Sequence, residues 1–261
     1  MRVSDKSVFK ISLQTTALLC IASSVLPQTK PTTSSSKGAV RVPFVGCKAD
    51  GQLGPLEAPR GPSQVVSISP EAAQKLAYYK GEQGSGVLAP RGWYCFETYG
   101  SDGNNLYVSS TPIDSKIILT GKWSGLVGPA IQFRTEFGST SGRFGVAEII
   151  ARVFPAHQAF VRDVIAEGIV PASSFPFGPY PDDKLTYKNS ETVEYLTPAK
   201  TDGLGTRSQL KKNGDPISGV AILTGPDTDL LLLSVRLPPD QSNLAAAIIQ
   251  QTERNAISSP D

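Results

Sequence analysis

Residues 84–110 read GSGVLAPRGWYCFETYGSDGNNLYVSS, and the rest of the chain is organised around this stretch. Two apolar, aromatic-rich runs flank the turn-rich residues 99–104, a pattern that is typical of a β-hairpin. Side chains alternate along a strand, so Trp93 and Cys95 are expected on one face. We expect Trp93 to be largely buried, as core packed over a disulfide. An aromatic platform for a ligand is the alternative.

Cys47 and Cys95 are the only cysteines that follow the amino-terminal segment. An exported protein with an even number of cysteines is expected to pair them. Closing a loop of this length stabilises a fold by about 4 kcal/mol in the chain-entropy model. The alternatives are metal ligation and a redox pair. The chain has one histidine and no C-x-x-C spacing, so we predict a disulfide, no metal and no cofactor.

Residues 1–27 are typical of a secretory signal peptide, with three basic residues followed by a short apolar run. Small residues allow cleavage after Ser24, to within a few positions. A membrane anchor is the alternative, but it needs about 20 apolar residues, and polar residues 14–16 interrupt this run. Residues 28–40 are rich in Pro, Ser, Thr and Lys, which predicts a flexible leader. We therefore expect a soluble protein, periplasmic or secreted, with no membrane span after signal removal.

The remaining chain is expected to form a single globular domain over residues 41–255. A sub-boundary is possible at the proline-rich residues 171–183, and residues 256–261 are expected to form a frayed tail. Expected strands and helices occur in clusters, which predicts an α+β fold with a mostly antiparallel sheet and helices packed on one face. Strands are expected at 42–47, 65–68, 87–89, 93–96, 106–108, 117–120, 131–137, 217–223 and 230–237, and a strand or hairpin at 184–196. Helices are expected at 69–81, 144–153, 156–167 and 240–255.

Composition favours no class of charged partner. The formal net charge is +2, and the basic residues are scattered. We expect no nucleic-acid binding, since no basic stripe or recognition motif occurs. The glycine-rich residues 121–129 match no phosphate-binding pattern. A tryptophan in such a loop is a candidate for an exposed contact, so Trp123 and Lys122 form the candidate contact surface. Residues 50–62, rich in glycine and proline, are a second candidate surface.

A hydrolase is the alternative function. His157 is the only histidine, so a histidine-dependent mechanism must use it, with a serine from residues 139–141 or 173–174. The nucleophile-elbow pattern G-x-S-x-G is absent. The sequence therefore favours an exported, disulfide-bonded domain of the cell envelope that is not an enzyme. We expect it to bind a protein, a polymer or a small ligand, or to have a structural role.

Overall fold

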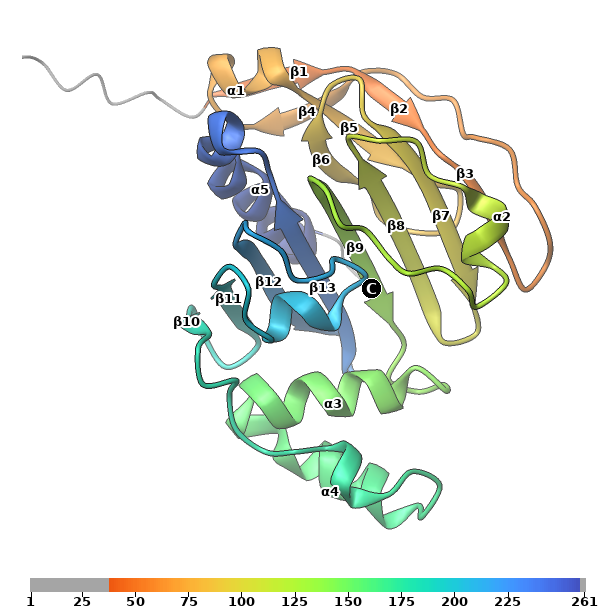
Figure 1. Ribbon diagram of the computed structural model, residues 1–261, viewed down its shortest axis with the longest axis vertical. Coiled ribbons are helices and arrows are strands. Elements are labelled where there is room, and N and C mark those ends of the chain that lie inside the picture. The colour runs from red at the N-terminus through yellow and green to blue at the C-terminus, as the bar shows by residue number, and fades with distance from the viewer. Residues whose placement is uncertain (1–37, 259–261) are drawn as a thin grey trace, which may run out of the picture. The chain divides into compact units, whose positions relative to one another are not determined.

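The computed structural model describes residues 38–258 (Figure 1). A large sheet is formed by β3 (Lys48–Gly51), β7 (Tyr94–Gly100), β8 (Gly103–Ser109), β9 (Ala130–Glu136), β10 (Lys184–Tyr187), β11 (Thr192–Thr197), β12 (Ile217–Thr224) and β13 (Asp229–Arg236). The strand order is β10-β11-β12-β13-β9-β8-β7-β3. All neighbours pair antiparallel except β3 and β7. The expected antiparallel majority is therefore confirmed for this sheet.

Two smaller sheets are formed within residues 39–90, a stretch that also contributes β3 to the large sheet. One contains β1 (Ala39–Val42) and β4 (Gln64–Ser67), and the other contains β2 (Phe44–Gly46), β5 (Leu76–Lys80) and β6 (Val87–Pro90). Pro43 separates β1 from β2, as expected for a residue that cannot donate to a ladder. β1 begins at Ala39, inside the stretch expected to be a leader. The expected signal peptide, residues 1–27, lies outside the described residues.

The helices are α1 (Pro70–Lys75), α2 (Ser115–Ile118), α3 (Arg143–Val153), α4 (Gln158–Ala166) and α5 (Ala245–Ser258). Short 3₁₀ turns occur at η1 (Pro155–His157), η2 (Ala172–Ser174), η3 (Leu204–Arg207) and η4 (Pro239–Leu244). α5 continues past residue 255, where a frayed tail was expected. The described residues lie in one compact unit. Within residues 38–258, no helix has the length and apolar character needed to cross a bilayer.

Two expected elements are wrong. The helix expected over 69–81 begins as predicted, because the Ser69 hydroxyl accepts the Ala72 N–H at 3.2 Å, but it ends at Lys75. Residues 76–80 instead form β5, which pairs with β6, so sheet packing overrides the helical pattern. The strand expected over 117–120 lies in and just after α2, where the Asp114 carboxylate accepts the Lys116 N–H and caps a helical turn.

Helices cover both faces of the large sheet, so the expectation of one face is also wrong. In β13, Leu233 and Val235 belong to the core cluster that includes residues of α5, and Leu231 packs against that cluster. The alternate residues Leu230 and Leu232 belong to the cluster that includes α3 and α4. Successive strand residues point to opposite faces, so α5 packs on one face of β13 and the α3–α4 pair packs on the other.

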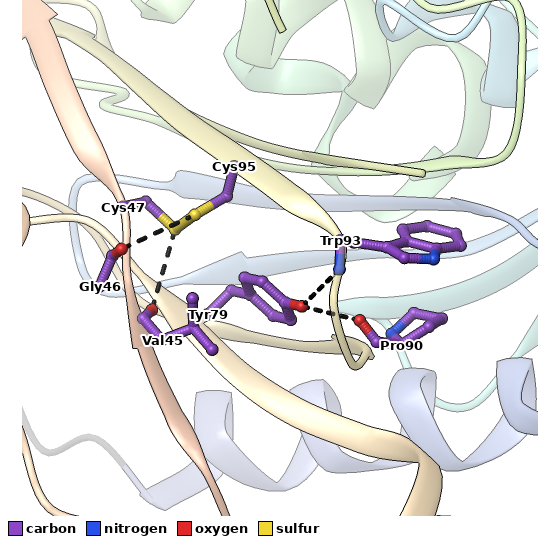
Figure 2. Close-up of a disulfide and its surroundings, with 7 residues drawn as sticks. All are labelled: Val45, Gly46, Cys47, Tyr79, Pro90, Trp93 and Cys95. Atoms are coloured by element: carbon purple, nitrogen blue, oxygen red, sulfur yellow. Dashed lines mark hydrogen bonds between the residues drawn. A yellow bond between two sulfur atoms is a disulfide. The ribbon is translucent and has the colours of Figure 1, made fainter. Parts of the chain in front are cut away.

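The predicted disulfide is confirmed. Cys47 and Cys95 are bonded, with their Cα atoms 5.4 Å apart. Cys47 lies between β2 and β3, so the bond fixes the point where the chain passes from the smaller sheet to the edge of the large one. The expected burial of Trp93 over the disulfide is wrong: Trp93 is only partly buried, and Figure 2 shows that its ring points away from the disulfide. The Tyr79 hydroxyl accepts the Trp93 N–H at 3.1 Å and donates to the Pro90 carbonyl at 2.8 Å.

Candidate functional site

The Trp123 pocket is a recess of about 320 Å³ where two loops meet the large sheet. It is lined by Thr98, Tyr107, Ile118, Leu119, Gly121, Trp123 and Gln209. Three separate parts of the chain contribute: strands β7 and β8, the 110–129 segment, and the 203–216 segment. This volume lies at the lower end of the range of about 300–1,000 Å³ that is usual for small-molecule sites.

Trp123 forms an aromatic wall of the pocket, and its ring packs on the buried ring of Tyr107. The ring centroids of Trp123 and Tyr107 are 5.0 Å apart, at an interplanar angle of 79°. This edge-to-face arrangement is a favourable geometry for an aromatic pair. Trp123 is partly buried and packs against a small core cluster of Tyr107, Leu126, Ala130, Leu210 and Ile217. The candidate Trp123 is therefore both anchored to the core and open at the pocket.

Buried amides on the sheet connect the pocket floor to the 203–216 segment. Gln132 of β9 lies opposite Tyr107 of β8 and is almost fully buried. Its Nε2 donates to Asn105 Oδ1 at 2.7 Å, and its Oε1 accepts the Gln209 N–H at 2.5 Å. Both polar ends of the Gln132 amide are thus paired, which fixes Gln209 over the sheet.

The two loops that form the rim pair with each other. The Leu126 N–H donates to the Gln209 carbonyl at 2.7 Å, and the Lys211 N–H donates to the Leu126 carbonyl at 2.9 Å. Asn213 Nδ2 adds a bond of 2.6 Å to the Val127 carbonyl. The glycine-rich segment is therefore an ordered, paired loop, since its backbone groups find partners in the other loop.

Arg236 joins these loops to the sheet. Its side chain is fully buried at the end of β13. Nη2 donates to the Leu126 and Gly128 carbonyls, both at 2.7 Å, and Nη1 donates to the Lys211 carbonyl at 2.5 Å. Burial lowers the pKa of Arg236, and nearby Asp215 opposes that effect. Sequence reasoning missed Arg236, although a charged residue in the apolar run of residues 230–237 is a signal of a buried polar function.

Gly125 is required in the rim loop. Its φ angle is +87°, a region that side chains rarely adopt. A Cβ atom there would lie 2.5 Å from the Gln209 carbonyl oxygen. Only glycine therefore allows the close approach of the two loops at this position.

Burial dominates the electrostatics beside the pocket. Burial raises the pKa of Tyr107, and the charge of Asp102 raises it further. The hydrogen bond of Tyr107 with Thr98 and the charge of Arg134 oppose this rise. Farther along β9, burial also raises the pKa of Glu136, although Arg134 opposes this with an ion pair of 3.1 Å. The charge of Arg134 is thus paired with Glu136, while Asp102 is a further acidic group that acts on both Tyr107 and Glu136.

His157 lies apart from the candidate serines. It ends the 3₁₀ turn after α3, whereas residues 139–141 precede α3. A helix of 11 residues is about 16 Å long, so these serines and His157 lie at opposite ends of it. His157 Nε2 is 3.7 Å from Glu191 Oε1, and the Ser190 hydroxyl donates to that same oxygen at 2.6 Å.

This order does not suit a catalytic triad. In a triad the histidine lies between the serine and the carboxylate, whereas here the Glu191 carboxylate lies between Ser190 and His157. Among the described residues, His157 Nε2 makes no hydrogen bond, so it has none with the serines at 173–174. The geometry therefore gives no support to the hydrolase alternative.

Of the other predicted surface residues, Lys122 lies beside the pocket and residues 50–62 lie away from its lining. Lys122 is exposed beside Trp123, and its N–H donates to the Thr120 hydroxyl at 3.4 Å. The second candidate surface, residues 50–62, contributes nothing to the lining of the Trp123 pocket. The structure thus brings Trp123 together with Tyr107 and Gln209, two residues that the sequence did not single out as site residues.

Comparison with known proteins adds no relative. Neither a protein-family model, nor a curated protein, nor a solved structure matches this chain. Within residues 38–258, no group of three or more His, Cys, Asp or Glu residues could hold a metal ion. Fold and site together define a disulfide-bonded α+β domain with an aromatic-walled pocket between two paired loops.

Proposed function

We propose that this protein is an exported, disulfide-bonded domain of the cell envelope that acts by binding a ligand in the Trp123 pocket. The observation that carries the proposal is the convergence of Trp123, Tyr107 and Gln209 from separate parts of the chain on one recess. A recess with an aromatic wall and a few fixed polar groups is the usual form of a binding site.

The framework of the pocket supports a role in binding. A fully buried arginine and a buried glutamine hold the rim loops in one arrangement. A binding site that is held in place before the ligand arrives loses less conformational entropy on association. The stacking and hydrogen-bonding groups of the lining suit recognition of a ligand without chemical conversion.

Export rests on the sequence together with the disulfide. A signal-like amino terminus predicts removal of the first 24 to 27 residues, and disulfides persist in oxidising compartments. The Cys47–Cys95 bond fits that location. Intact mass measurement of the protein recovered outside the cytoplasm tests export. We expect the mass of a chain that begins between residues 25 and 28, lowered by about two daltons because the disulfide removes two hydrogens. A cytoplasmic protein that retains Met1 contradicts export.

Binding is tested by retention on envelope fractions. We expect the wild-type protein to be retained by envelope material of the organism that produces it, and Trp123→Ala to reduce retention by about tenfold, as loss of a central aromatic anchor does. Tyr187→Ala is the matched control, because Tyr187 is an exposed aromatic on β10 and does not line the pocket. Equal retention of the wild type and Trp123→Ala would remove the pocket from the function.

A further inference from the structure

The lining of the Trp123 pocket is uncharged. Its polar groups are one hydroxyl, one phenol, one indole and one carboxamide, from Thr98, Tyr107, Trp123 and Gln209. The nearest charged pair described above, Arg134 with Glu136, is internally compensated. Lys122 is exposed beside Trp123 but does not line the recess, so an ionic ligand would find no opposite charge in the lining itself, which is unfavourable when charges lose water. The lining therefore selects a neutral, polar ligand.

Several hydrogen-bonding groups of the pocket have no partner within residues 38–258. The Trp123 indole N–H donates to no other described residue, and the Gln209 carboxamide likewise pairs with none, since Gln209 is bonded only through its backbone. Indole offers one donor, whereas a carboxamide offers two donors and an acceptor oxygen. Donors and an acceptor thus stand together beside two aromatic rings.

On the basis of the binding function proposed above, we propose that the Trp123 pocket binds a neutral sugar ring of an envelope glycan. A pyranose ring presents C–H groups on its faces, which pack on an aromatic wall. Its edge presents hydroxyls, each of which both donates and accepts. The mixed donors and acceptors of Gln209 and Trp123 match that edge, and a recess of about 320 Å³ has room for a ring of this size.

A proline-rich peptide is the competing ligand, because such segments also bind aromatic-lined surfaces. Recognition of an extended peptide uses a groove that follows the polyproline helix for several residues. Here the aromatic wall is a single Trp123–Tyr107 pair, and the free polar groups are gathered around one recess. The geometry favours a ring over an extended chain.

Tryptophan fluorescence gives a direct test, since the chain has two tryptophans. In Trp93→Phe, Trp123 is the only indole, and its emission reports the pocket alone. The full chain is titrated with chitotetraose, cellotetraose, maltotetraose and a proline-rich decapeptide. We expect a saturable change with at least one tetrasaccharide and none with the peptide. Calorimetry with the unmodified chain gives the same answer if Trp93→Phe is poorly folded.

Variants connect that binding to the pocket. We expect Trp123→Ala and Gln209→Ala each to weaken sugar binding by about tenfold or more. Tyr187→Ala should leave sugar binding unchanged. The sugars are tested up to ~10 mM, a concentration at which even a site of millimolar affinity is filled. The sugar proposal is overturned if none of the three sugars gives a saturable response. It is also overturned if the decapeptide binds saturably and the sugars do not.

Failure of the sugar proposal and failure of the binding function give different results. If envelope retention depends on Trp123 but no sugar binds, the pocket is the binding site and its ligand is of another class. If retention is also independent of Trp123, both proposals are wrong.

Discussion

The Arg236 guanidinium donates to the Leu126 carbonyl oxygen at 2.7 Å, which ties a fully buried charge of β13 to the loop that carries Trp123. The same side chain also donates to Gly128 and Lys211. One residue thus joins both rim loops to the sheet. The shape of the Trp123 pocket depends on this residue, although Arg236 does not line it.

Arg236→Ala should destabilise the fold by about 3–5 kcal/mol, because it removes four hydrogen bonds from a charged donor to the Leu126, Gly128 and Lys211 carbonyl oxygens. Denaturant unfolding measures the loss. Arg162→Ala, at an exposed position of α4, is the control and should change stability by less than about 0.5 kcal/mol. Arg236→Lys keeps one charged donor group, so its loss of stability should lie between those of Arg236→Ala and Arg162→Ala. A cost below about 1 kcal/mol for Arg236→Ala would contradict its role in the loops.

Gly125→Ala should destabilise the protein more than Gly54→Ala does. Both glycines have positive φ angles, +87° and +91°, so both variants incur strain of about 1–2 kcal/mol. Only Gly125 also faces a carbonyl oxygen, that of Gln209, at 2.5 Å from a new Cβ atom, while Gly54 faces open space. Parallel thermal melts measure the difference, and equal losses would show that the loops do not approach as described.

Sequence patterns predicted most of the elements that build this site, and packing decides the rest. The hairpin of β7 and β8 was predicted because its alternation and turn residues are local signals. Residues 76–80 were wrongly expected to be helical, because Leu76, Ala77 and Tyr79 fit both a helical stripe and a strand, and only pairing with β6 decides between them. The partnership of Gln132 with Gln209 spans 77 residues, and no local pattern reports contacts of that separation.

Reducing the disulfide should lower stability by about 4 kcal/mol, since the bond closes a long loop in the unfolded chain. Cys47 and Cys95 are 48 residues apart. Urea unfolding with and without reductant measures the loss. A variant with both Cys47→Ala and Cys95→Ala should match the reduced protein and be insensitive to reductant. Equal stability of the oxidised and reduced wild type would show that the junction of the two sheets needs no covalent bond.

Glu97→Gln should change how stability depends on pH. Glu97 is fully buried, and its Oε2 accepts the Gln83 N–H at 3.1 Å. Burial raises the pKa of Glu97, while backbone N–H groups including that of Gln83, and the charge of Lys80, oppose the rise. The folded state therefore holds the proton more tightly than the unfolded state does. This contribution to stability is complete below the unfolded-state pKa and is lost as pH rises through the folded-state pKa.

The wild type should thus lose stability relative to Glu97→Gln as the pH rises from about 4 to about 7. Denaturant unfolding at several pH values measures the difference between the two proteins. Glu57→Gln, at an exposed side chain, is the control and should follow the wild type. A constant difference between the wild type and Glu97→Gln across this range would contradict a raised pKa in the folded protein.

Site-specific crosslinking from position 122 gives the sharpest test of ligand binding in the Trp123 pocket. Lys122 is exposed beside Trp123, so a photoreactive amino acid placed there reports what occupies the pocket in the producing organism while leaving Trp123 in place. We expect a discrete adduct from position 122 that is lost when Trp123→Ala is added, and no such adduct from a photoreactive group at position 187. An adduct that persists without Trp123, or the same adduct from both positions, would contradict ligand binding in this pocket.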